Sequence, residues 1–199
     1  MREIAIIDSG GANIASLVYA LKRLNTSSIL TTDSEIIKNA DRVLLPGVGA
    51  AKDAMYKLKK AGLVDVIKNL KQPVLGICLG MQLLSDFSEE ENVECIGVIP
   101  GAASKLKASP TKPVPNMGWC STKILSKNKI LKNIKNNNYF YYIHSYALPV
   151  SKFTIATAEH EEPFSAVIQK NNFFATQFHP ERSSDEGSKL LANFLGKGI

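Results

Sequence analysis

A cysteine flanked by glycines, where an apolar strand-like run meets an apolar helix-like run, is the feature that most constrains this chain. The segment reads Gly76-Ile77-Cys78-Leu79-Gly80. The residues just before it are typical of a short buried strand, and those after it of a helix. At such a turn the side chain is pushed out of the sheet, the small neighbours relieve crowding, and the helix start favours a thiolate. The sequence therefore predicts that Cys78 is a nucleophile at a strand-to-helix turn.

A histidine and a glutamate lie far downstream, in Gln177-Phe178-His179-Pro180-Glu181. Residues two apart on an extended segment share a face, so we expect His179 and Glu181 to point toward one site. Each feature has a simpler interpretation on its own. A free cysteine is usually a small buried apolar residue, and a His–Glu pair is usually on the surface. Together, a nucleophile, a base and an orienting acid favour an enzyme with a cysteine nucleophile.

Short β-rich runs alternate with helical ones through the first half of the chain. We expect strands at residues 4–8, 43–45 and 74–77, and helices at 14–24, twice within 52–70, and from 81 onward. Further strands are expected at 139–146, 154–158, 166–169 and 173–177, a looped or helical excursion at 123–138, and a closing helix at 188–195. The pattern predicts one α/β domain, residues 1–199, with a three-layer, doubly wound, mostly parallel sheet and an antiparallel extension.

Composition argues against several classes of protein. The chain has 199 residues, 45% of them hydrophobic, which suffices for one sizeable core. No apolar stretch approaches the roughly 20 residues of a membrane span, and the N-terminal residues do not resemble a signal peptide. The 3 cysteines are widely spaced and form no Cys-x-x-Cys pair, which argues against disulfides and a cysteine zinc site. We therefore expect a cytoplasmic protein with no membrane partner.

The net charge of +6 raises the question of nucleic-acid binding. Its lysines are spread along the chain and interrupted by acidic runs, and no nucleic-acid-binding motif accompanies them. We expect solvated lysines and no nucleic-acid partner. The glycine-rich turns at residues 9–13 and 46–49 fit neither a dinucleotide fingerprint nor a phosphate loop. We therefore expect no cofactor and no metal.

The two motifs resemble those of the class I, triad-type glutamine amidotransferases, and the resemblance extends over residues 4–194. Three further segments, at residues 45–49, 114–119 and 142–146, are similar to the glutaminase subunits of imidazole glycerol phosphate synthase, an enzyme of histidine biosynthesis. The resemblance implies a flavodoxin-like core and hydrolysis of L-glutamine to glutamate and ammonia. It assigns Cys78 as the nucleophile, His179 as the proton shuttle and Glu181 as the residue that orients the imidazole.

The resemblance also implies the groups that surround the substrate. The oxyanion would be bound by backbone N–H groups of Leu79 and of a loop containing Val48 and Gly49, whose peptide could flip between orientations. Glutamine itself would contact Gly49, Gln82, Glu90, Ser145 and Tyr146. Which carboxylate of the run Glu89-Glu90-Glu91 takes part stays open at this point.

A partner protein is the last implication of the resemblance. The ammonia would pass to a synthase (cyclase) subunit with a (βα)8 barrel in a heterodimer. The expected interface residues are Asn13, Met117, Trp119 and Arg182, and the alternative for Trp119 is a place in the core. The segment that usually reads Pro-His-Met-Gly-Trp-Asn departs from that pattern at two positions here, with Asn116 in place of the histidine and Cys120 in place of the asparagine. A sugar-amidation synthase of surface-glycan synthesis as the partner, and a non-catalytic binding module, stay open as alternatives.

Overall fold

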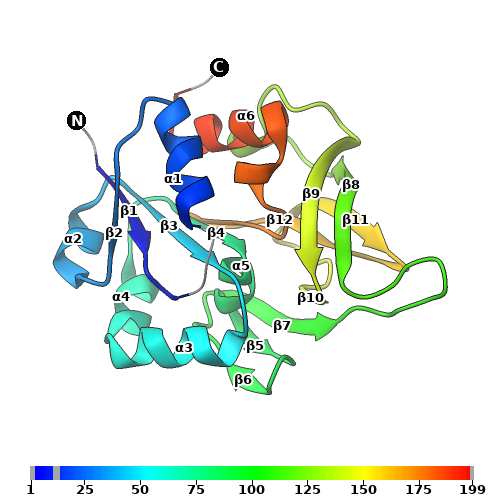
Figure 1. Cartoon of the computed structure of the whole chain (residues 1–199), viewed down its shortest axis with the longest axis horizontal. Helices are drawn as coiled ribbons and strands as arrows, with labels where there is room; N and C mark the ends of the chain where they lie inside the picture. Colours follow the sequence, from blue (N-terminus) through cyan, green and yellow to red (C-terminus); the bar gives the residue numbers. More distant parts are fainter. Residues whose placement is uncertain (1–2, 11–13, 198–199) are drawn as a thin grey trace.

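The computed structural model describes residues 3–10 and 14–197, and in these residues a nine-stranded mixed sheet forms the centre of the protein (Figure 1). The strand order is β2 (Ser28–Thr31), β1 (Ile4–Ile7), β3 (Arg42–Gly47), β4 (Val74–Cys78), β13 (Phe173–Thr176), β12 (Glu162–Lys170), β11 (Thr154–His160), β8 (Asn116–Ile124) and β9 (Asn138–His144). The strands from β2 to β13 are parallel, and antiparallel pairing begins between β13 and β12. This arrangement confirms the predicted mostly parallel sheet with an antiparallel extension.

Helices cover both faces of the parallel half, as Figure 1 shows. One face carries α1 (Ile14–Arg23) and α6 (Ser184–Phe194), and the other carries α2 (Ser34–Asn39), α3 (Ala51–Lys60), α4 (Leu63–Asn69) and α5 (Leu79–Leu83). Successive residues of a strand point to opposite faces, so Ile4 and Ile6 pack in the core with α1 and α6, whereas Ile7 packs in the core with α3 and α4. Burial on both faces is the reason that β1 is apolar throughout.

A second, four-stranded sheet lies beside the carboxyl end of β4. Its order is β10 (Tyr146–Ala147), β7 (Ile99–Lys105), β5 (Ser85–Ser88) and β6 (Val93–Glu94). Two short 3₁₀ helices complete the described structure, η1 (Lys129–Leu131) and η2 (Pro180–Arg182). The excursion predicted at residues 123–138 thus contains the end of β8, the helix η1 and turns.

The predicted elements of the first half are present, with two additions. The strand β2 and the helix α2 were not predicted, and α5 begins at Leu79, two residues before the expected helix start. In the second half, β8 was missed entirely, and α6 begins four residues earlier than expected, at Ser184 against 188. The small sheet was not predicted either, because β5, β6 and β10 have only two to four residues and the longer β7 contains a proline, a glycine and polar residues.

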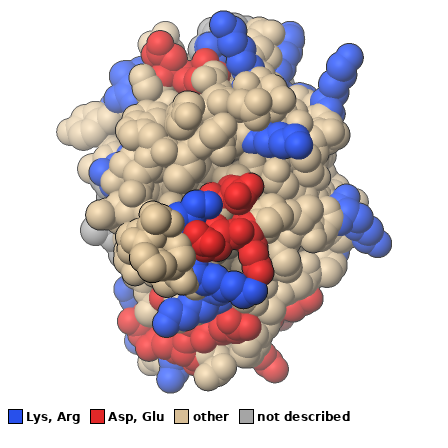
Figure 2. Space-filling model, turned by 90° about the vertical axis from the view of Figure 1, so that its right-hand side faces the viewer, with Lys and Arg blue, Asp and Glu red and all other residues tan. Residues whose placement is uncertain are grey.

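Acidic and basic side chains are interspersed on the face of the molecule that bears the antiparallel extension (Figure 2). Two ion pairs cross this region, between Lys107 and Glu162 and between Lys112 and Glu159. No continuous basic stripe is visible on the face drawn. Within residues 3–10 and 14–197, no helix combines the length and apolar character needed to cross a membrane.

Candidate active site

Cys78 ends β4 and immediately precedes α5, at the predicted strand-to-helix turn. Its backbone has φ 53° and ψ −109°, a conformation that costs a non-glycine residue about 1–3 kcal/mol. The neighbouring glycines make this sharp turn feasible. A Cβ atom at Gly80 would lie 1.7 Å from the carbonyl oxygen of Leu45, and one at Gly76 would lie 2.8 Å from the carbonyl oxygen of Gly80. Only residues without a side chain allow the turn to pack this tightly against β3.

His179 and Glu181 form a buried pair, with 2.8 Å between Nδ1 and Oε1 and 5% exposure of each side chain. The predicted reason for their proximity was wrong. The strand β13 ends at Thr176, and Glu181 lies in η2 rather than on an extended segment shared with His179. The 3₁₀ turn brings the carboxylate back toward the imidazole instead.

Ser183 holds this turn in place. Its hydroxyl donates to the carbonyl oxygen of His179 at 2.7 Å and accepts the N–H of Tyr141 at 2.9 Å. The N–H of His179 in turn donates to the carbonyl oxygen of Tyr141 at 2.9 Å. Residues at the end of the parallel half are thereby joined to β9, at the far edge of the sheet. Sequence reasoning missed Ser183 because its role depends on this long-range contact.

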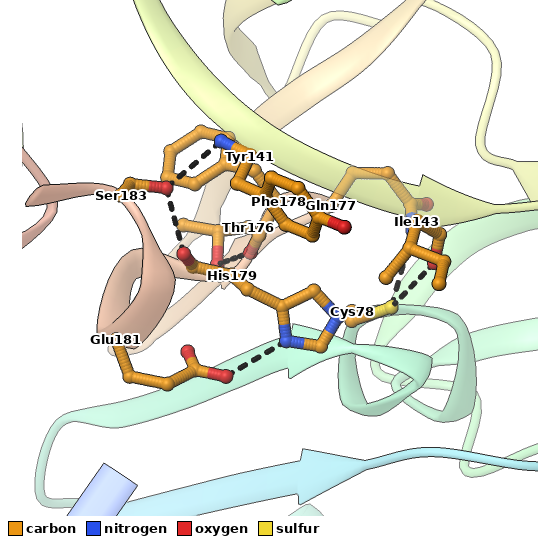
Figure 3. Close-up of polar contacts among 9 residues, drawn as sticks. All are labelled: Cys78, Tyr141, Ile143, Thr176, Gln177, Phe178, His179, Glu181 and Ser183. Atoms are coloured by element: carbon orange, nitrogen blue, oxygen red, sulfur yellow. Dashed lines mark hydrogen bonds and ion pairs between the residues drawn. The ribbon is translucent and has the colours of Figure 1, made fainter. Parts of the chain in front are cut away.

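The sulfur of Cys78 lies among polar groups from three segments (Figure 3). Its thiol donates to the carbonyl oxygen of Ile143 at 3.6 Å, and the side-chain amide of Gln177 donates to it at 3.9 Å. The imidazole of His179 lies between Cys78 and Glu181. Because Nδ1 of His179 is hydrogen-bonded to Glu181, Nε2 is the ring atom that faces the sulfur of Cys78. Gln177 is fully buried and was not predicted as a site residue.

The electrostatic surroundings favour a charged His179. Burial alone would lower the pKa of the imidazole, but the neighbouring Cys78 and Glu181 outweigh burial and raise it to about 10. His179 is therefore an imidazolium at neutral pH. A positively charged imidazole therefore lies beside the sulfur of Cys78.

A cavity of about 270 Å³ opens onto Cys78 and His179. All seven of the predicted oxyanion and substrate residues line it, namely Val48, Gly49, Leu79, Gln82, Glu90, Ser145 and Tyr146. Sequence reasoning missed three other lining residues, Pro115, Ile143 and His144. The structure thus brings together residues between Val48 and His179, a span of about two thirds of the chain.

Glu90 is the member of the acidic run that reaches this cavity. Its carboxylate accepts the N–H of Ala51 at 3.1 Å, at the start of α3, whereas Glu89 accepts the N–H of Lys105 and does not line the cavity. Burial raises the pKa of Glu90, an effect that the Ala51 hydrogen bond reduces and the charge of Glu91 reinforces. The partly buried carboxylate is suited to an ammonium group of a ligand.

Three of the predicted interface residues, Met117, Trp119 and Arg182, lie on the surface. Met117 and Trp119 are 65% and 52% exposed, so the alternative of a core tryptophan is wrong. The ring of Tyr141 lies between Trp119 and Arg182. It contacts the Trp119 ring edge-on at 6.1 Å, and the guanidinium of Arg182 lies 4.5 Å above its centre. Asn13, the remaining predicted member, lies outside the described residues. No cluster of metal-binding side chains occurs in the part of the chain that the structure describes.

Comparison with known proteins identifies the family. The family described as glutamine amidotransferase class-I matches residues 5–197. This chain belongs to that family. The fold and the resemblance predicted from the sequence are thereby confirmed.

Relatives within the amidotransferases match the chain over nearly its whole length. Imidazole glycerol phosphate synthase subunit HisH 2 of Legionella pneumophila (strain Paris) is 47% identical and is matched over 96% of each chain. Subunit HisH of Bacteroides fragilis is 45% identical over 97% of this chain and 98% of the relative. Subunit HisH of Vibrio parahaemolyticus is 42% identical over 98% of both.

Solved structures show the same amidotransferase fold at lower sequence identity. A glutamine amidotransferase from Thermotoga maritima has a TM-score of 0.67 at 18% identity, with 96% of this chain and 80% of that chain covered. The structure of PurLQS from Thermotoga maritima has a TM-score of 0.70 at 16% identity, with coverages of 98% and 97%. These two comparisons support the fold.

Proposed function

We propose that this chain is the glutaminase subunit of an imidazole glycerol phosphate synthase. It hydrolyses L-glutamine to glutamate and ammonia through Cys78, His179 and Glu181. The ammonia is delivered to a cyclase subunit with a (βα)8 barrel, which makes imidazole glycerol phosphate and aminoimidazole carboxamide ribotide in histidine biosynthesis. The observation that carries the proposal is the position of the His179–Glu181 pair beside Cys78, at a cavity lined by every predicted substrate residue.

The first half of the reaction forms a thioester. The thiolate of Cys78 attacks the side-chain amide carbon of glutamine, and the carbonyl oxygen becomes an oxyanion. The N–H of Leu79 is a donor for this oxyanion, because it belongs to the first turn of α5 and has no partner within the helix. The Nε2–H of His179 protonates the departing nitrogen, the C–N bond breaks, and ammonia leaves.

The second half of the reaction restores the enzyme. Neutral His179 removes a proton from water, which attacks the thioester carbon, and the C–S bond breaks to give glutamate and the Cys78 thiolate. Glu181 keeps Nδ1 of His179 protonated throughout. Nε2 therefore serves as the proton donor in the first half of the reaction and as the proton acceptor in the second. Glu90 is positioned to pair with the substrate ammonium group.

Two measurements test this proposal. A glutamine-analogue electrophile should label Cys78, and Cys78→Ser should abolish the labelling. The chain should then support glutamine-dependent synthesis when mixed with the cyclase and its ribotide substrate. Labelling of Cys78 together with activity only with a sugar-amidation synthase would retain the glutaminase and refute the assigned acceptor. Absence of labelling would refute the glutaminase itself.

A further inference from the structure

The strand β8 presents two different faces. Met117, Trp119 and Ser121 are exposed, whereas Asn116 and Thr122 are buried and Cys120 is half-buried. This alternation follows from the pleat of a strand, in which successive side chains point to opposite sides. The outward face carries the predicted partner residues. The inward face packs over the core, on the same side of the sheet as Tyr142 and His144 of β9.

A chain of hydrogen bonds leads from Asn116 into that pocket. The side-chain nitrogen of Asn116 lies 3.1 Å from Nε2 of His144, and Nδ1 of His144 lies 2.9 Å from the carbonyl oxygen of Tyr146. The same carbonyl oxygen accepts the side-chain amide of Gln82 at 2.9 Å. His144, Tyr146 and Gln82 all line the cavity beside Cys78, but Asn116 does not.

These contacts permit only one arrangement of protons. A carbonyl oxygen cannot donate, so Nδ1 of His144 carries the proton, and Nε2 must accept from the Asn116 amide if the ring is neutral. Burial lowers the pKa of His144 to about 4, an effect that the Tyr146 hydrogen bond opposes and that the nearby His160 and His179 reinforce. His144 is therefore neutral at physiological pH, with both nitrogens bonded.

Cys120 contacts the end of the Asn116 amide that does not face the imidazole. Its thiol donates to Oδ1 of Asn116 at 3.4 Å, so the oxygen points toward Cys120 and the nitrogen toward His144. The two residues that depart from the usual Met-Gly-Trp segment are thus in direct contact with each other.

We propose that Asn116, oriented by Cys120, is a positioning residue that fixes the tautomer of His144 and so holds the Tyr146 carbonyl and Gln82 at the glutamine pocket. This inference deepens the proposed function and rests on it for the identity of the ligand. It also means that β8 connects the predicted partner residues Met117 and Trp119 to the substrate loop, the segment His144-Ser145-Tyr146 that lines the pocket. A displacement of the outward side chains would act on the pocket through Asn116.

The tautomer can be measured directly, because the chain has only 3 histidines. With ¹⁵N-labelled imidazoles, His144 should show a protonated Nδ1 and an unprotonated Nε2 at neutral pH, with assignment by His160→Gln. In Asn116→Asp the carboxylate can only accept, so Nε2 of His144 should gain a proton. An unprotonated Nε2 in both proteins would overturn the proposal. This readout requires neither a partner protein nor catalysis.

Glutamine binding provides the functional test, measured by calorimetry in a Cys78→Ala background. Asn116→Asp should raise the Kd for glutamine by about tenfold, as expected for misplacing one hydrogen-bonded group. Thr122→Val is the matched control, since Thr122 lies on the same buried face of β8 and bonds to the Tyr142 hydroxyl at 2.7 Å instead. It should leave both the Kd and the His144 tautomer unchanged. An unchanged Kd in Asn116→Asp would overturn the positioning role.

Glutamine binding by the Cys78→Ala protein tests the proposed function separately from the role of Asn116. If the Cys78→Ala protein with Asn116 intact bound no glutamine, the proposed function would fail, and the tautomer measurement alone would decide the role of Asn116. Cys120→Ser, which retains a donor, should preserve the His144 tautomer, whereas Cys120→Ala should allow the Asn116 amide to turn. Equal effects of the two Cys120 substitutions would contradict the orienting contact.

Discussion

The carbonyl oxygen of Ile143 lies 3.6 Å from the sulfur of Cys78, although β9 and β4 are separated in the sheet by β13, β12, β11 and β8. The antiparallel extension must therefore curve back over the end of the parallel half. The stacked rings of Phe140 and Phe178, 4.1 Å apart, hold β9 to the segment before His179. The active-site cavity is the space enclosed by this return.

Cys78→Ala should separate ammonia production from ammonia use. In a complex with the cyclase, glutamine-dependent synthesis should fall by roughly 10⁴-fold or more, because no nucleophile remains. Synthesis from added ammonium salts should persist, because the proposed function places the acceptor reaction on the partner. The two activities are measured side by side on the same assembled complex. Equal loss of both would contradict the assigned role.

Glu181→Gln should be milder than His179→Ala, by about tenfold to a hundredfold in turnover, because orientation is less essential than proton transfer. Glu181 also raises the pKa of His179 toward about 10, so this pKa should fall in Glu181→Gln. The imidazole would then lose its proton at lower pH than in the unchanged protein. NMR titration of His179 checks the direction, and near-normal turnover of His179→Ala would require a different triad.

Glu90→Gln should raise the KM for glutamine and alter its pH dependence. Because the pKa of Glu90 is raised, the carboxylate becomes neutral at a higher pH than an ordinary glutamate as the solution is acidified. The KM of the unchanged protein should therefore rise at mildly acidic pH, and Glu90→Gln should lack that rise. Glu89→Gln is the control, since that carboxylate binds the N–H of Lys105 away from the cavity. Identical KM profiles for Glu90→Gln and the unchanged protein would exclude this ammonium contact.

Trp119→Ala should weaken cyclase binding by about 2 kcal/mol, because exposed aromatic anchors often dominate interfaces. The fold should be spared to within about 0.5 kcal/mol, since the indole is 52% exposed and contacts Tyr141 only edge-on. Tyr56→Ala, at an exposed aromatic residue of α3, is the matched control. Unfolding of the isolated Trp119→Ala protein without a selective loss of binding would refute the interface assignment.

The isolated chain should hydrolyse glutamine slowly, and a cyclase occupied by its ligand should raise the rate by orders of magnitude. Gly49 has φ +93°, and no other atom lies within 4 Å of the place where a Cβ would be, so the backbone at Gly49 has room to reorient. One oxyanion donor is worth roughly 10²–10³ in rate. The ligand of the cyclase can shift this equilibrium only if it binds more tightly when the loop peptide is in its active orientation. Steady-state assays on the free chain, the complex and the ligand-bound complex decide, and equal turnover in all three would exclude the switch.

Local sequence signals predicted the parallel half of the fold well. The runs that became β1, β3 and β4 are apolar because both faces of the sheet are covered, and the glycines around Cys78 indicated the turn directly. The strand β8 was missed because its large apolar residues, Met117 and Trp119, are exposed, whereas its buried positions include the polar Asn116 and Thr122. A half-exposed strand carries too weak an apolar pattern to be distinguished from a loop.

Resemblance supplied the candidate site more fully than local patterns did. Motif positions led to the residues that line the cavity, whereas His144, Gln177 and Ser183 were missed. Their places depend on β9 returning to the end of β4, and no neighbouring residue in the sequence indicates that contact. The His–x–Glu pair shows the opposite case, because the residues were identified correctly although the backbone between them is a 3₁₀ turn.

The alternation along β8 also sets a rule for engineering. Its odd-numbered side chains, Met117, Trp119 and Ser121, can be replaced without opening the core, because they lie on the exposed face. Its even-numbered ones are bound to the substrate loop through Asn116 and to β9 through Thr122. To retarget this glutaminase to a different synthase, only the outward-facing residues of β8 should be exchanged. Replacing the whole strand would also change the affinity of the glutaminase for glutamine.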